Sequence, residues 1–153
     1  MLPKTHILVG FIVSLSLFML LPQIGLLGAL IIFLSSFLID FDHYLYYVLK
    51  QKDHSLRRAY YWFIDQGRYF KKLSRIEQDK YKRVIMIFHG VECWVILLLL
   101  LIFVNKVFLF ILVGIAIHMI LDFMDLIKRN QPLHIKTSQI YTHIKNKKRA
   151  ELK

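Results

Sequence analysis

Residues 107–127 read VFLFILVGIAIHMILDFMDLI, a run that is apolar except for one histidine and two aspartates. A helix needs about 20 predominantly apolar residues to cross the hydrocarbon core of a bilayer, so this run predicts a membrane span. His118, Asp122 and Asp125 follow one another at i, i+4 and i+7, which places them on one face of that helix. Ionisable groups are costly inside a bilayer, and their presence on one face indicates a function.

Three further apolar runs come earlier in the chain. We expect four spans, at about residues 6–22, 24–48, 84–104 and 107–128. The first two are joined by Leu21-Pro22-Gln23, which indicates a tight helical hairpin. The first run also has the short apolar core of a signal peptide, but it lacks a small-residue cleavage site. The sequence therefore predicts an all-α fold, a polytopic membrane four-helix bundle at 1–130, followed by a basic cytoplasmic tail at 131–153.

Basic residues are segregated from the apolar runs. The chain has 21 Lys and Arg against 10 Asp and Glu, although 57% of its residues are hydrophobic. The basic residues concentrate at 50–83 and after residue 128, whereas the two short connections on the opposite side hold few. By the positive-inside rule, both termini and the 50–83 segment are cytoplasmic. Because this rule accounts for the charge, we expect no nucleic-acid partner.

The 50–83 segment interleaves aromatic side chains with Lys and Arg. This mixture is typical of a helix that lies at the headgroup level on anionic lipid. Asp53 or Ser55 is placed to cap such a helix. Ser74 and Glu77 have capping-box spacing, which predicts that the third membrane helix begins near Arg75, before the membrane. We therefore expect a cytoplasmic interfacial helix between spans two and three, with anionic headgroups as partners. The alternative is a solvated basic loop that only sets topology.

Ionisable residues within the spans gather toward one side of the predicted membrane. They are His6, Asp40, Asp42, His43, His89, Glu92, His118, Asp122 and Asp125. By the predicted topology, all of them lie toward the cytoplasm, and each of the four spans contributes at least one. Helix bundles build metal centres in this way. Since imidazole favours transition metals, we expect one or two divalent ions, zinc in the first place, with manganese or iron as alternatives.

Each of these residues has an expected role. The predicted metal ligands are His6, Asp40, His43, His89, His118 and Asp122. Glu92 or Asp42 would act as the general base, and Asp125 would orient a ligand histidine. Three other histidines lie in basic, polar segments and are expected at the surface: His54, His134 and His143. The simpler alternative is that the polar residues only form hydrogen bonds between helices.

The order of these residues resembles a known family. After His6, the chain has LIDFDH at residues 38–43, FHG at 88–90, and then His118-x-x-x-Asp122. This is similar to the YdjM-like membrane-bound metal-dependent hydrolases, whose pattern is an N-terminal His, Pro-Asp-x-Asp-His, Thr-His-Ser and a late His-x-x-x-Asp. The resemblance covers about residues 5–125.

The chain also departs from this pattern. Ile39 replaces the motif proline, and Phe88 and Gly90 flank the central histidine in place of Thr and Ser. The His-Arg pair that precedes this motif in the family is absent, since the chain has Arg83-Val84-Ile85 there. These departures affect the expectation of catalysis more than that of a metal site.

The resemblance implies hydrolysis of a phosphate ester, because the family is distantly similar to zinc-dependent phospholipase C. We therefore expect a membrane-embedded, metal-dependent hydrolase that acts on a lipid-borne phosphoester at the cytoplasmic headgroup level of a bacterial or archaeal membrane. One alternative is a metal or proton carrier that uses the same polar layer, although the outer halves of the spans are apolar. The other is a structural membrane protein. No oligomeric state is predicted.

Overall fold

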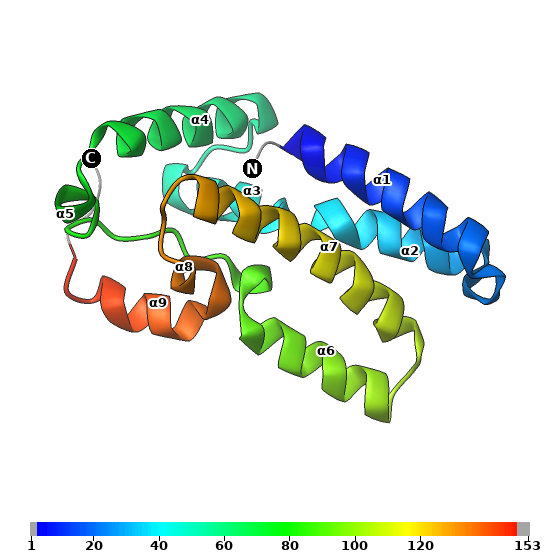
Figure 1. The fold of residues 1–153 in the computed structure, drawn as a ribbon. Helices are drawn as coiled ribbons and strands as arrows, with labels where there is room; N and C mark the ends of the chain where they lie inside the picture. The colour runs from blue at the N-terminus through cyan, green and yellow to red at the C-terminus, as the bar shows by residue number, and fades with distance from the viewer. Residues whose placement is uncertain (1–2, 150–153) are drawn as a thin grey trace.

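The computed structural model describes residues 3–149, and most of them are helical (Figure 1). The elements in chain order are α1 (Pro3–Leu20), η1 (Pro22–Ile24), α2 (Gly25–Leu38), α3 (Phe41–Gln51), α4 (Leu56–Lys72), α5 (Arg75–Gln78), η2 (Ile87–His89), α6 (Val91–Phe103), α7 (Val107–Lys128), α8 (His134–Thr137) and α9 (Gln139–Asn146). No β-strand occurs within residues 3–149, so the predicted all-α class is confirmed.

Three helical stretches are long and apolar enough to cross a membrane: Pro3–Leu20, Pro22–Gln51 and Val107–Lys128. Their outer faces expose large apolar side chains, including Met19 and Leu26, which are 73% and 74% exposed. Apolar surface of this extent is unfavourable in water and favourable against lipid. These features are those of a membrane protein.

The connection between α1 and α2 is as short as predicted. Leu21 leaves the helical conformation, with φ −128° and ψ 76°, because the following proline disfavours that conformation at the residue before it. Pro22 then begins η1, where its missing N–H costs nothing. The two helices therefore run antiparallel, which returns the chain to the end of the molecule where it began (Figure 1).

Two glycines allow α1, α2 and α7 to approach closely. A Cβ atom added to Gly10 on α1 would lie 1.9 Å from Ser36 Oγ on α2, and one added to Gly114 on α7 would lie 2.4 Å from Ile32 O. Only glycine permits these distances, and small residues at such contacts are common between membrane helices. Three helices thus meet at Gly10 and Gly114, each about one helical turn from His6 on α1 and from His118 on α7, respectively.

The regular α-helical hydrogen bonding is interrupted between α2 and α3. Asp42 N donates to Ile39 O and His43 N to Asp40 O, so the hydrogen bonds in this turn span three residues instead of four. This tighter turn changes the direction in which the following side chains point. A regular helix would separate Asp42 from the other two polar residues, whereas in the structure Asp42 is buried beside His43.

The third predicted span begins later than expected. Its helix, α6, starts at Val91 instead of near residue 84 and has 13 residues. At about 1.5 Å per residue it is about 20 Å long, shorter than the ~30 Å hydrocarbon core. The preceding stretch bonds instead to side chains far along the sequence, since Arg83 N donates to Asn146 Oδ1 and Met86 N donates to Gln139 Oε1. These bonds replace those of a helix.

The 50–83 segment contains the long helix predicted there. Ser55 caps α4 by accepting from Arg58 N, and α4 packs on α3 through the ring contact of Trp62 with Tyr47. The capping box of Ser74 and Glu77 is present too, but the helix that it begins, α5, ends at Gln78.

The segment expected as a tail is folded within its described part, to residue 149. It forms α8 and α9, which lie beside the start of α6 (Figure 1). His54 and His143 are exposed as predicted, whereas His134 in α8 is half-buried.

Candidate metal centre

All six predicted ligands come together at one end of the helices, although they belong to five different segments. They form two adjoining groups, in each of which the ligand atoms lie within 4.8 Å of one another: His6, His118 and Asp122, and Asp40, His43 and His89. α1 and α2 both pack against α7, which places His6 beside His118, and the turn that follows α2 places Asp40 at the same level. The sequence pattern placed these residues at similar depth, and the structure brings them into one cluster.

The centre of the cluster is the contact between His89 and His118, whose Nε2 atoms are 3.1 Å apart. The opposite nitrogen of each ring has its own acceptor. His89 Nδ1 lies 3.0 Å from Asp42 Oδ2, and His118 Nδ1 lies 2.9 Å from Ser36 O. Because a carboxylate and a carbonyl only accept, each Nδ1 carries the proton, and in the neutral rings each Nε2 presents a lone pair.

Two lone pairs that face each other at this distance repel unless a proton or a cation lies between them. Zinc binds histidine nitrogens at 2.0–2.1 Å, so two ligand nitrogens on a tetrahedral ion lie roughly 3.3 Å apart. The observed separation of His89 Nε2 from His118 Nε2 is close to this value. The two rings are thus held in the tautomer, orientation and spacing that suit a shared metal ion.

Two carboxylates surround the same point. Asp122 Oδ2 lies 3.1 Å from His118 Nε2 and 3.5 Å from His89 Nε2. Asp40 Oδ1 lies 3.6 Å from each of these nitrogens. A set of two imidazoles and two carboxylates is chemically suited to zinc, manganese or iron.

His6 extends the cluster toward α1. Its ring stacks on that of His118 with centroids 4.0 Å apart, and its Nε2 lies 3.5 Å from Asp122 Oδ1. The side chain is buried, and neither ring nitrogen has a hydrogen-bond partner within the described chain. A buried imidazole without hydrogen bonds is costly, so a metal ion or a proton shared with Asp122 would stabilise it.

Asp42 has a different position from the one expected for a general base. Its carboxylate accepts from the backbone N–H of Phe88 at 3.2 Å and contacts Nδ1 of both His43 and His89 at 3.0 Å. It is 3% exposed. Asp42 therefore orients the rings of His43 and His89, a position that carboxylates commonly take around metal-binding histidines. The sequence predicts that position for Asp125, whose carboxylate forms an ion pair with Arg129 at 2.9 Å. The role of Asp42 as a general base stays a prediction.

Glu92, the other candidate base, contacts the C-terminal segment. Its carboxylate accepts from Ser138 Oγ at 2.7 Å, from Gln139 N at 3.2 Å and from Ile140 N at 3.1 Å. It thereby caps the N-terminus of α9, where a negative charge is favourable. The role of Glu92 as a general base stays a prediction.

Lys136 is the member of the site that sequence reasoning missed. Its Nζ forms an ion pair with Asp122 Oδ2, although Lys136 belongs to α8 in the expected tail. Within the described residues, one ammonium group thus joins three converging carboxylates, those of Asp40, Asp42 and Asp122. With neutral imidazoles, an excess of negative charge remains in a mostly buried site, which a divalent cation would offset. No spacing in the sequence links residue 136 to this site.

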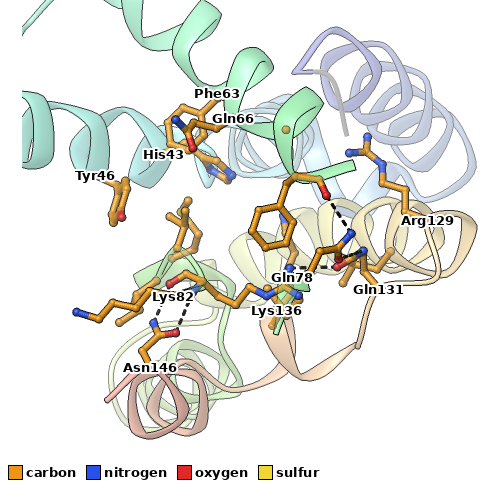
Figure 2. A pocket seen from close by; sticks show the side chains of 18 of the residues that line it. His43, Tyr46, Phe63, Gln66, Gln78, Lys82, Arg129, Gln131, Lys136 and Asn146 are labelled. Atoms are coloured by element: carbon orange, nitrogen blue, oxygen red, sulfur yellow. Dashed lines mark hydrogen bonds between the residues drawn. The ribbon is translucent and has the colours of Figure 1, made fainter. Parts of the chain in front are cut away.

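The cluster borders a large cavity, with a volume of about 910 Å³. His43 and Lys136 belong to both the cluster and the cavity wall. Figure 2 shows His43 and Phe63 on one side of the cavity, with Lys82, Lys136 and Asn146 across from them. A molecule in this cavity would therefore have access to the polar cluster.

Comparisons of the chain with protein-family models, with curated proteins and with solved structures found no match. The resemblance to the YdjM-like hydrolases thus stays a prediction from the motifs alone. The candidate site depends on the geometry of its own residues.

Proposed function

We propose that this chain is a four-span, membrane-embedded, metal-dependent hydrolase that acts on a lipid-borne phosphoester at the cytoplasmic headgroup level. The observation that carries the proposal is the 3.1 Å approach of His89 Nε2 to His118 Nε2, with the opposite ring nitrogens bound to fixed acceptors. Hydrogen bonds between helices alone do not require two lone pairs to face each other. A structural role therefore explains this geometry less well.

The ligands divide into a central set and two flanking histidines. By their distances, the central set is His89, His118, Asp122 and Asp40, and the flanking residues are His6 and His43. The central set would hold one zinc ion, and the flanking histidines leave room for a second. A bound divalent ion would polarise a phosphoryl oxygen and activate a water molecule. The protein itself contributes Asp42 and Ser36 O, which fix the ligand rings, and the ammonium of Lys136, which can contact an anionic phosphoryl group.

The place of the site along the helices supports a substrate at the membrane surface. The cluster lies at the end of the helices from which the aromatic and basic α4 extends (Figure 1). α6 would provide the fourth span, with the irregular stretch before it lying at the cytoplasmic interface. A lipid headgroup could reach such a site while its acyl chains stay in the bilayer.

Elemental analysis of the detergent-purified full chain tests the metal centre. We expect about one to two equivalents of transition metal per chain, and loss of most of it in His118→Ala. The matched control is His54→Ala, because His54 is exposed and outside the cluster. A wild-type protein without metal, or two variants that bind metal equally, would contradict the proposal.

Hydrolysis is tested separately. Zinc-loaded protein in nanodiscs that contain phosphatidic acid should release phosphate, whereas chelator-treated protein should not. The same preparation distinguishes the carrier alternative, because zinc uptake into proteoliposomes without phosphate release would identify a carrier and refute the hydrolase.

A further inference from the structure

The cavity beside the cluster carries strong positive charge. Seven Lys and Arg side chains line it, whereas among the described lining residues the one carboxylate is that of Asp125. Three of these cations have carboxylate partners: Arg129 pairs with Asp125 at 2.9 Å, Lys136 pairs with Asp122, and Arg83 lies 3.7 Å from Asp79. The seven basic side chains still outnumber these three carboxylates. Like charges that surround a partly enclosed space raise one another's energy, and an anion between them lowers it.

Arg83 provides an independent indication of an anionic ligand. Its side chain lines the cavity and is 9% exposed, and its Nε has no hydrogen-bond partner within the described chain. The guanidinium group lies over the ring of Phe70 at 4.4 Å, its Nη1 donates to Gln131 Oε1 at 3.1 Å, and its Nη2 lies 3.7 Å from the exposed carboxylate of Asp79. Burial, together with the nearby Arg149, lowers the pKa of Arg83 to about 10. A buried donor without a partner is costly, and an anionic oxygen would satisfy it.

The volume of the cavity sets the size of the ligand. Sites for small molecules commonly measure about 300–1,000 Å³, so 910 Å³ is far more than one phosphate group fills. The walls also include the aromatic side chains of Tyr46, Trp62 and Phe63. These could contact a less polar part of the same ligand.

We propose that this cavity binds the phosphate-bearing polar part of a ligand with at least two negative charges, held by Lys71, Lys82 and Arg83. The ligand is a phosphate monoester or a diphosphate, carried by a lipid or by a soluble compound. The proposal that an anion binds here depends only on the features of the cavity. The orientation of the ligand, with its phosphate group toward Lys136 and His43, rests on the proposed function.

Calorimetric titration of the chelator-treated full chain in neutral detergent tests the binding. The probes are inorganic pyrophosphate and, separately, nanodiscs of phosphatidic acid or of phosphatidylcholine. The inner double variant, named for its place in the cavity lining, is Lys71→Gln with Lys82→Gln; these two side chains line the cavity and are solvent-exposed, like those of the control. The control double variant is Lys72→Gln with Lys80→Gln, which removes the same charge from neighbouring exposed positions outside the lining.

We expect wild-type protein to bind pyrophosphate, the inner variant to bind it at least about tenfold more weakly, and the control to change by less than about threefold. Preference for phosphatidic acid over phosphatidylcholine, without pyrophosphate binding, would support the site and assign the ligand to a lipid. Equal weakening in both double variants would overturn the proposal, since only net charge would then matter. Absence of binding to any probe would also overturn it, as would binding that requires added zinc.

These outcomes are separable from the proposed function. Anion binding that persists in a protein without metal or hydrolase activity would refute the hydrolase and leave the cavity proposal intact. Metal binding and hydrolysis without anion binding in the cavity would refute the cavity proposal and leave the hydrolase proposal intact.

Discussion

Asp42 shows how a single residue departs from the helical pattern. Simple periodicity separates it from Asp40 and His43, but the tight turn at Ile39 directs its carboxylate toward His89. The spacing of His118 and Asp122 behaves differently. Both lie within one regular helix, and the predicted i, i+4 pairing is present at 3.1 Å. Local patterns are thus reliable inside a long regular helix and fail where the helical hydrogen bonding is interrupted.

The substitution Asp42→Asn tests whether Asp42 orients the rings of His43 and His89. An amide keeps the shape of the side chain but loses the charge, and it can accept at only one of its two polar atoms. We expect the protein to fold and to bind zinc about 10–100-fold more weakly, as is usual for outer partners of metal ligands. Competition with a chromophoric chelator measures the affinity.

The matched control for this measurement is Asp65→Asn. Asp65 is an exposed carboxylate on α4 and lies outside the cluster. Equal zinc affinity in Asp42→Asn and Asp65→Asn would show that Asp42 does not support a ligand.

Among the elements, α8 and α9 were the least predictable from the sequence. Their composition is basic and polar, which is typical of a tail, and their positions depend on partners far along the chain. Glu92 accepts from Ser138, and Asn146 bonds to the backbone of Arg83 in both directions. Contacts between residues so far apart produce no periodic pattern in the sequence from which they could be predicted. The same contacts explain why α6 begins late and how Lys136 reaches the cluster.

Glu92→Ala distinguishes the capping role from that of a general base. The change leaves Ser138 Oγ and the backbone N–H groups of Gln139 and Ile140 without their acceptor. Loss of a helix cap costs about 0.5–2 kcal/mol, so we expect faster amide hydrogen exchange across α9. Zinc content should stay at the wild-type level, since Glu92 is not a ligand here.

Hydrogen exchange followed by mass spectrometry, together with elemental analysis, measures both effects. Gln66→Ala on α4 serves as a control for which exchange in α9 should not change. Wild-type exchange in α9, combined with loss of hydrolysis, would instead identify Glu92 as the base.

At the scale of the whole molecule, the short connections and the basic segments lie at opposite ends. Figure 1 shows the α1–α2 and α6–α7 connections at one end, and α4, α5 and α9 at the other. The charge distribution alone predicts this separation, because it alternates along the chain in step with the apolar runs. The cluster lies toward the basic end. The segregation of charge along the sequence thus predicts which end of the molecule is basic. The contacts within the cluster could be identified only from the three-dimensional structure.

Cysteine labelling tests whether the basic end of the molecule faces the cytoplasm and the end with the short connections faces the outside. The chain has one native cysteine, Cys93, so Cys93→Ser provides a background without other thiols. In that background, Gln23→Cys and Asn105→Cys mark the two short connections, and Arg57→Cys marks the start of α4. With both termini cytoplasmic, a membrane-impermeant maleimide should label the first two in intact bacterial cells and the third only in inverted vesicles.

The position of α6 depends on the same measurement. Its 13 helical residues are fewer than a span ordinarily needs, so labelling has to establish whether α6 crosses the membrane. If α6 crosses the membrane, Asn105→Cys lies outside together with Gln23→Cys. Labelling of Gln23→Cys outside and of Asn105→Cys only in inverted vesicles would show that α6 does not cross. In that case α7 could not cross as proposed either, because the chain would already be on the cytoplasmic side where α7 begins.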